Sequence, residues 1–231
     1  MPRAASLRED IMKSRIKLVI FDLDDTLTKG PTIWEYIHEE MGTWESHGIK
    51  YYEEFLAGKF GYNAFIRKDV ACWKGLPLSN VRKAIKRMQY IPELKKTIRK
   101  LSKLGIDTAL VSSSIEIFAR YVEKKFGIKH VYANPLRTKD GRLAGKVELL
   151  VPGKGKGRIT RYIKRSLGLK KREILAVGDS TYDLPMFKEA GICVTFDDAA
   201  DAVKKHADHV VRKDHIYKLL SIVTKGDQKC L

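Results

Sequence analysis

The sequence has little cysteine and no long hydrophobic run. Its three cysteines, Cys72, Cys193 and Cys230, lie far apart without metal-ligand spacing, which indicates reduced thiols in a cytoplasmic protein. No apolar run reaches the ~18 residues that a bilayer span requires. The charged N-terminal residues lack the apolar stretch of a signal peptide. We therefore expect neither a disulfide-stabilised secreted fold nor a membrane partner.

Positive charge dominates the chain and is unevenly placed. The net charge is +17, of which residues 93–231 carry +14 and residues 30–92 carry +2. The densest run, between Glu148 and Glu173, has nine basic residues and no acidic one. Such a run is typical of a solvated helix face. Attraction of an anionic small substrate or of nucleic acid stays open as an alternative.

Short apolar segments alternate with amphipathic helical segments after residue 92, and this order predicts an α/β fold with a doubly wound parallel sheet. Helices are expected from Pro92 to Gly105 and over residues 115–126. In such sheets ligands bind beyond the carboxyl ends of the strands. The predicted strands are residues 17–23, 107–113, 173–179, 192–196 and 209–212.

Residues 30–92 have a different pattern, with no convincing strand and all three tryptophans. We predict a small helical cap domain here, inserted after the first strand between core segments 1–29 and 93–231. Its expected helices are residues 32–45, 50–57, 62–74 and 78–88. Within residues 132–147 the Asp140-Gly141 pair predicts a β-hairpin.

The strongest chemical signal is the motif Phe21-Asp22-Leu23-Asp24-Asp25-Thr26-Leu27, directly after an apolar strand. Two carboxylates two residues apart at a strand end can turn toward one site. One can then attack while the other transfers protons. Asp22 and Asp24 are therefore candidate catalytic residues, and Thr26 can order the loop by hydrogen bonding.

A second motif, Val177-Gly178-Asp179-Ser180-Thr181-Tyr182-Asp183, also follows an apolar strand. Clustered carboxylates without His or Cys favour a hard cation such as Mg²⁺. Two weaker signals accompany it. Hydroxyls and free N–H groups at Ser112-Ser113-Ser114 can seat a phosphate, and the loop from Gly153 to Arg158 is flexible and cationic.

These motifs, in this order, resemble the haloacid dehalogenase superfamily. Its signature is Asp-x-Asp-x-Thr, then a Ser or Thr closing a strand, then a Lys, then Gly-Asp-x-x-x-Asp. The resemblance covers about residues 15–220. It is greatest to the phosphoserine phosphatase branch, which also carries a helical cap. The segments that carry the branch likeness are Leu76-Pro77, Lys139-Asp140-Gly141, Lys156-Gly157 and residues 186–191.

The resemblance implies a Rossmann-like core and a Mg²⁺-dependent phosphatase that acts on a small phosphorylated metabolite. Asp22 would attack phosphorus to form an aspartyl-phosphate, and Asp24 would protonate the leaving oxygen and then activate water. The implied ligands of Mg²⁺ are Asp22, the carbonyl of Asp24, Asp179 and Asp183. The implied phosphate-binding residues are Thr26, Ser112, Ser113 and Lys156.

The chain departs from phosphoserine phosphatases where those enzymes bind the amino-acid head with a cap-side Glu and Arg. The corresponding positions are Pro31 and Asp69, with Arg67 and Lys68 nearby. We therefore expect phosphoserine to be a poor substrate. A phosphate ester with a less acidic or more aromatic leaving group, facing Trp34, Tyr62 or Trp73, should be preferred. The candidate substrate-binding residues are Asp69, Arg67, Trp34 and Tyr62. The alternatives are a phosphotransferase using the same intermediate, or a basic nucleic-acid-binding protein with a vestigial site. We do not expect nucleic acid as the main partner, because the aromatic residues lie apart from the basic ones.

Overall fold

A six-stranded parallel sheet runs through the centre of the computed structural model, which describes residues 16–225. The predicted α/β fold with a doubly wound parallel sheet is confirmed. Residues 1–15, assigned above to the core segment, and Cys230 lie outside the described range. In sheet order the strands are β10 (His209–Val211), β9 (Ile192–Phe196), β8 (Ile174–Val177), β1 (Leu18–Phe21), β4 (Asp107–Ile115) and β5 (His130–Asn134).

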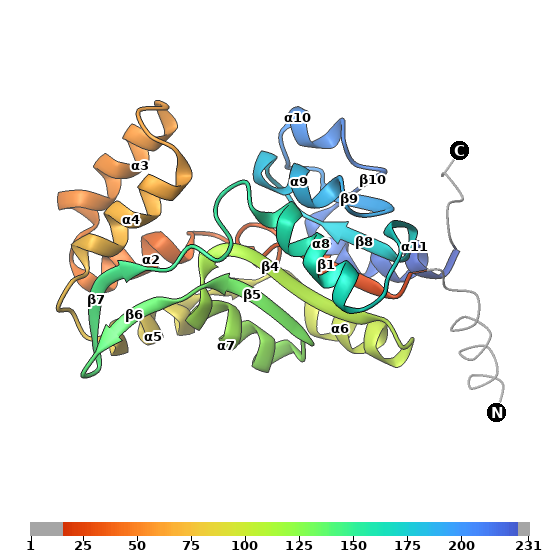
Figure 1. The fold of residues 1–231 in the computed structure, drawn as a ribbon, viewed down its shortest axis with the longest axis horizontal. Coiled ribbons are helices and arrows are strands. Elements are labelled where there is room, and N and C mark those ends of the chain that lie inside the picture. Colours follow the sequence, from red (N-terminus) through yellow and green to blue (C-terminus); the bar gives the residue numbers. More distant parts are fainter. Residues whose placement is uncertain (1–15, 226–231) are drawn as a thin grey trace.

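Helices cover both faces of this sheet (Figure 1). Successive residues of β1 alternate between two buried clusters, with Val19 and Phe21 in one and Leu18 and Ile20 in the other. This two-sided burial explains the continuous apolar strand in the sequence. The first cluster contains residues of α6 (Leu94–Lys103), α7 (Glu116–Phe126) and α11 (Leu219–Lys225). The second contains residues of α8 (Lys156–Ser166), α9 (Leu184–Phe187) and α10 (Asp201–Lys204).

The segment between β1 and α6 is mainly helical, as predicted, and lies to one side of the sheet (Figure 1). We call its helices the cap helices: α2 (Ile33–Met41), η1 (Trp44–Gly48), α3 (Ile49–Leu56), α4 (Tyr62–Cys72) and α5 (Leu78–Arg87). Their buried residues join the same cluster as one face of the sheet, so the domain boundary at residues 30–92 stays a prediction.

The prediction that residues 30–92 contain no strand was wrong at one place. β3 (Gln89–Tyr90) pairs antiparallel with β2 (Thr28–Lys29), where the chain leaves and re-enters the core. Two-residue strands have too little hydrophobic alternation to be recognised in a sequence.

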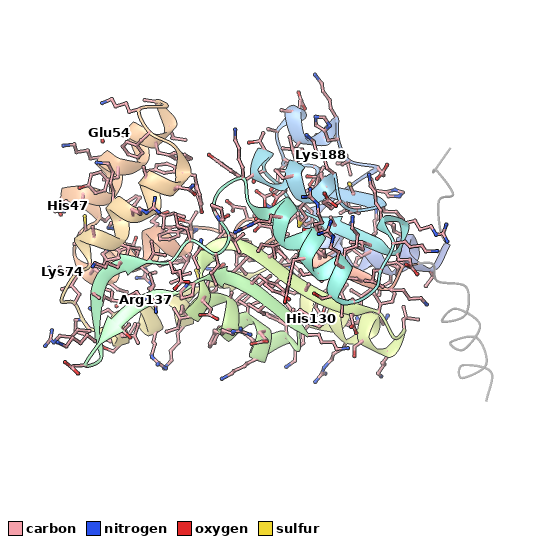
Figure 2. All side chains as sticks on the ribbon, in the orientation of Figure 1. His47, Glu54, Lys74, His130, Arg137 and Lys188 are labelled. Carbon is pink, nitrogen blue, oxygen red and sulfur yellow. The ribbon has the colours of Figure 1, made fainter. Side chains whose placement is uncertain are left out.

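The predicted hairpin is present as β6 (Leu136–Lys139) and β7 (Arg142–Val147). Asp140 and Gly141 have φ values of 50° and 73°, the left-handed backbone that an Asp-Gly turn provides. The hairpin packs on the cap helices, since Leu143 exchanges backbone hydrogen bonds with residues 75 and 76. Figure 2 shows Lys74 beside β7, where a Cβ added to Gly145 would lie 2.9 Å from the Lys74 Cβ.

No helix within residues 16–225 has the length and apolar character needed to cross a membrane. Cys72 and Cys193 are free thiols within the same range.

Candidate active site

The sequence motifs meet at one edge of the sheet because β8, β1 and β4 are neighbours. Asp22 directly follows β1, Asp179 is the second residue after β8, and Ser112 lies in the last part of β4. The strands are parallel, so their carboxyl ends bring these three residues together across more than 150 positions of sequence.

Lys156 at the start of α8 links two of the carboxylates. Its Nζ lies 2.6 Å from Oδ1 of Asp22 and 2.6 Å from Oδ1 of Asp183. Burial alone would lower the pKa of Lys156, but Asp183 and Asp22 together raise it above its ordinary value. Burial raises the pKa of Asp22 well above its ordinary value, and Lys156 opposes that rise. Lys156 therefore stays charged and offsets the negative charge around Asp22.

Asp183 holds the turn that carries Asp179. Its Oδ2 accepts hydrogen bonds from the backbone N–H of Asp179 at 3.1 Å and of Ser180 at 3.0 Å. The turn passes so close that a Cβ added to Gly178 would lie 2.4 Å from the Asp183 carboxyl carbon. Glycine at this position is therefore a packing requirement of the acidic turn.

Asp24 has the environment of a proton donor. One of its carboxylate oxygens is buried without a hydrogen-bond partner. Burial raises the pKa of Asp24 to about 6, and the nearby Ser114 hydroxyl is the main influence that opposes the rise. A carboxyl with this pKa can both donate and accept a proton near neutral pH.

The predicted phosphate-binding residues divide into two groups. Ser112, Ser113 and Lys156 line a cavity above the sheet edge. Thr26 does not, because its buried hydroxyl donates a hydrogen bond to Oδ1 of Asp179 at 2.5 Å. Thr26 thus supports the turn that carries Asp179. Its predicted contact with the phosphate stays a prediction.

Carboxylate oxygens of Asp22, Asp179 and Asp183 lie within 4.8 Å of one another. An oxygen-only cluster of this size has the donor set of a hard divalent cation, so the residues fit the metal that the sequence predicts. The carboxylate of Asp24 is not in this cluster. Its predicted contribution through a backbone carbonyl stays a prediction.

The cavity has a volume of about 420 Å³ and continues from the sheet edge into the cap helices. Trp34, Tyr62 and Asp69, three of the predicted substrate-binding residues, line it. Arg67 is exposed and is not among the lining residues, so the structure does not bring it to the others. Lys68 is also directed elsewhere, with its Nζ 5.0 Å from the ring centroid of Tyr51.

Asn134, at the end of β5, is a residue that sequence reasoning missed. Its side-chain amide donates to the carbonyls of Ser113 at 2.7 Å and Val151 at 3.1 Å, and its oxygen accepts from the Val151 N–H. It therefore joins β4 at Ser113 to the segment that leads to Lys156. A lone Asn in a strand gives no sequence signal of such a contact.

His38 in α2 was also missed, although it lines the cavity. Its Nε2 lies 3.3 Å from Oδ1 of Asp69. The spacing of Trp34 and His38, four residues apart on one helix, places both on the same face and was the available signal.

Comparisons with known proteins agree with this geometry. A family model described as haloacid dehalogenase-like hydrolase matches residues 19–188. The chain is 34% identical over 213 residues to the phosphoserine phosphatase of Methanocaldococcus jannaschii, which covers 92% of this chain and 100% of that protein. It is 29% identical to the phosphoserine phosphatase of Streptococcus thermophilus, covering 89% of this chain and 95% of that protein.

Solved structures give the same result. A phospho-aspartyl intermediate analogue of phosphoserine phosphatase has a TM-score of 0.79 and 33% identity, covering 90% of this chain and 99% of that one. A substrate-bound phosphoserine phosphatase complex has a TM-score of 0.80 and 32% identity, covering 90% and 98% of the two chains. The chain therefore belongs to the haloacid dehalogenase-like hydrolases and is a phosphatase of their phosphoserine phosphatase-like branch.

Proposed function

We propose that this protein is a Mg²⁺-dependent phosphatase that hydrolyses a small phosphate monoester through an aspartyl-phosphate on Asp22. The observation that carries the proposal is the position of Asp22, bonded to Lys156 and clustered with Asp179 and Asp183 at the base of the cavity. A phosphate that enters the cavity meets the carboxylate of Asp22, the ammonium of Lys156 and the proton-donating carboxyl of Asp24 at one place.

In this mechanism Asp22 attacks phosphorus and the ester oxygen leaves with a proton from Asp24. Asp24, now ionised, takes a proton from water, and that water hydrolyses the acyl phosphate and frees Asp22. Lys156 and the Ser112 hydroxyl bind phosphoryl oxygens and so stabilise the charge that develops on them. Bound at Asp22, Asp179 and Asp183, Mg²⁺ would supply further charge neutralisation between the carboxylate and the phosphate.

We further propose that phosphoserine is not the preferred substrate, although the relatives described above are phosphoserine phosphatases. Among the described residues that line the cavity, Lys156 is the only Lys or Arg. The end formed by the cap helices contributes Asp69 and Glu35, which repel a carboxylate. Losing a charge-assisted hydrogen bond costs roughly 1.5–3 kcal/mol, so binding of the phosphoserine head is disfavoured.

The test is hydrolysis of p-nitrophenyl phosphate with Mg²⁺ and with EDTA. Asp22→Asn should reduce the rate on the order of 10⁴-fold or more, and EDTA should remove activity that Mg²⁺ restores. Asp140→Asn is the matched control, because the exposed Asp140 lies outside the cavity lining and has a φ of 50° that asparagine also accepts. A tenth of the wild-type rate in Asp22→Asn, or full activity in EDTA, would refute the mechanism. A phosphate-ester panel with phosphoserine ranking first would refute the substrate proposal.

A further inference from the structure

The far end of the cavity, formed by the cap helices, has an unusual composition. Aromatic side chains make up most of its lining. The charged side chains there are the two carboxylates Asp69 and Glu35, while Lys156 lies at the opposite end beside Asp22. This end therefore combines aromatic faces with negative charge. Its lining aromatic residues are Trp34, Trp44, Tyr52, Phe55, Tyr62 and Phe65.

Asp69 is almost completely buried, with 1% of its surface exposed. Neither of its two carboxylate oxygens has a hydrogen-bond partner. Burial raises the pKa of Asp69, and only His38, whose Nε2 is 3.3 Å away, opposes that rise. A buried carboxylate without hydrogen-bond partners is costly, so a ligand that satisfies it gains binding energy.

His38 is the polar neighbour of Asp69, but its ring is held by other residues. Its Nδ1 lies 2.8 Å from the hydroxyl oxygen of Thr43 and 3.4 Å from the indole nitrogen of Trp73. Its Nε2, 3.3 Å from Oδ1 of Asp69, makes no hydrogen bond. The carboxylate oxygens of Asp69 are therefore left for a ligand to satisfy.

We propose that this end of the cavity binds an ammonium group, so that the substrate is a phosphate monoester whose alcohol carries an ammonium and no carboxylate. This inference rests on the proposed phosphatase function. Aromatic faces attract cations, most strongly where water is excluded, and a carboxylate adds direct charge pairing. Amino alcohol and amino sugar phosphates share this chemistry, and a cavity of about 420 Å³ accommodates either.

A neutral, hydroxyl-rich alcohol is the competing occupant, because hydroxyl groups also donate to a carboxylate and sugars also stack on aromatic rings. An ammonium is favoured because it compensates the buried charge of Asp69, whereas a hydroxyl leaves that charge uncompensated. The two occupants predict different rankings of matched substrates.

The experiment compares kcat/KM within pairs of phosphate esters that differ chiefly in the ammonium. Phosphoethanolamine is paired with propyl phosphate, phosphocholine with 3,3-dimethylbutyl phosphate, and glucosamine 6-phosphate with glucose 6-phosphate. We expect the ammonium ester to be preferred at least about tenfold in at least one pair, which corresponds to about 1.4 kcal/mol. The inference is overturned if no pair shows the preference, or if phosphoserine ranks above phosphoethanolamine.

Asp69→Asn should bring the preferred ratio close to one, while Glu53→Gln, an exposed carboxylate of α3 outside the cavity lining, should leave it unchanged. The ratio is measured on one enzyme preparation, so it does not depend on the folded fraction of a variant. A preference that persists in Asp69→Asn overturns the role of Asp69.

Hydrolysis of p-nitrophenyl phosphate by the wild type distinguishes failure of the phosphatase proposal from failure of the ammonium inference. If the wild type does not hydrolyse this ester, the phosphatase mechanism is refuted. If it hydrolyses the ester but shows no ammonium preference, only this inference is refuted.

Discussion

The Nζ of Lys156 lies 2.6 Å from a carboxylate oxygen of Asp22 and 2.6 Å from one of Asp183. Both carboxylates belong to the acidic cluster proposed to hold Mg²⁺. One buried cation therefore serves two opposed purposes. It attracts phosphate and favours the ionised form of Asp22 against the effect of burial, but it also repels a metal ion at the neighbouring oxygens.

Lys156→Met should separate these effects because methionine keeps much of the length and removes the charge. We expect kcat/KM for p-nitrophenyl phosphate to fall on the order of 10²-fold or more. The Mg²⁺ concentration that gives half-maximal activity should stay the same or decrease. Lys154→Met is the matched control, since Lys154 is exposed in the loop just before α8. Unchanged activity, or a weaker response to Mg²⁺ in Lys156→Met, would contradict the assignment.

The metal-free protein should lose stability as the pH rises. Burial, and then Asp183, raises the pKa of Asp179 to about 7, and burial raises that of Asp24 to about 6. Each carboxyl has a higher pKa folded than unfolded, where it is near 3.8. The folded state therefore binds more protons between the two values. Each group lowers the free energy of unfolding by about 1.4 kcal/mol per pH unit in that window.

Asp179→Asn tests this prediction because asparagine can still accept the Thr26 hydrogen bond. In EDTA, the Tm of the variant relative to the wild type should increase between about pH 4 and pH 7, the window between the unfolded and folded pKa values of Asp179. Comparing the two proteins cancels the contribution of the histidines. Parallel curves of Tm against pH would show that Asp179 titrates normally in the folded protein.

The catalytic motifs were predictable because each is local. Asp22 and Asp179 follow apolar strands, and parallel strands deliver their carboxyl ends to one edge whatever the length of the connection. The Asp140-Gly141 turn was predictable for the same reason, since its backbone conformation depends on two adjacent residues.

Contacts between distant segments were not predictable in this way. Thr26 lies in the first motif but bonds to Asp179, 153 residues away. Asn134 bonds to Ser113 because β4 and β5 are neighbours in the sheet. It bonds to Val151 because the segment before α8 passes next to the end of β5. His38 meets Asp69 through helix packing in the cap helices. No residue type or spacing encodes such pairs, since they depend on the tertiary structure.

Asn134 should be important for both stability and turnover. Asn134→Ala leaves the buried Val151 N–H and the Ser113 carbonyl without their partner, at a cost of about 1–3 kcal/mol for each unsatisfied group. Asn134→Asp keeps the acceptor for Val151 but removes both donors, so it should be no better than the alanine variant. Chemical denaturation and kcat measure the two effects. Wild-type values in either variant would show that the amide bonds are dispensable.

The basic helix α8 should act as a solvated surface. Arg161 and Lys164 both pair with Glu189, at 2.6 Å each, and Arg158 donates to the Leu150 carbonyl. Arg165 is exposed, and none of these four basic residues lines the cavity. Surface pairs of this kind contribute about 0–1 kcal/mol, and distant exposed charges are screened by salt.

We therefore expect Arg165→Glu to leave kcat/KM within about twofold of the wild type at both low and high ionic strength. The measurement compares ~0.01 M with ~1 M ionic strength, between which the Debye length falls from about 30 Å to about 3 Å. The Arg165→Glu substitution changes the local charge by two units. It is therefore a sensitive probe of substrate attraction, which depends on the sign of the local electric field. If Arg165→Glu lowers kcat/KM only at low ionic strength, the helix attracts the anionic substrate and has a function beyond solvation.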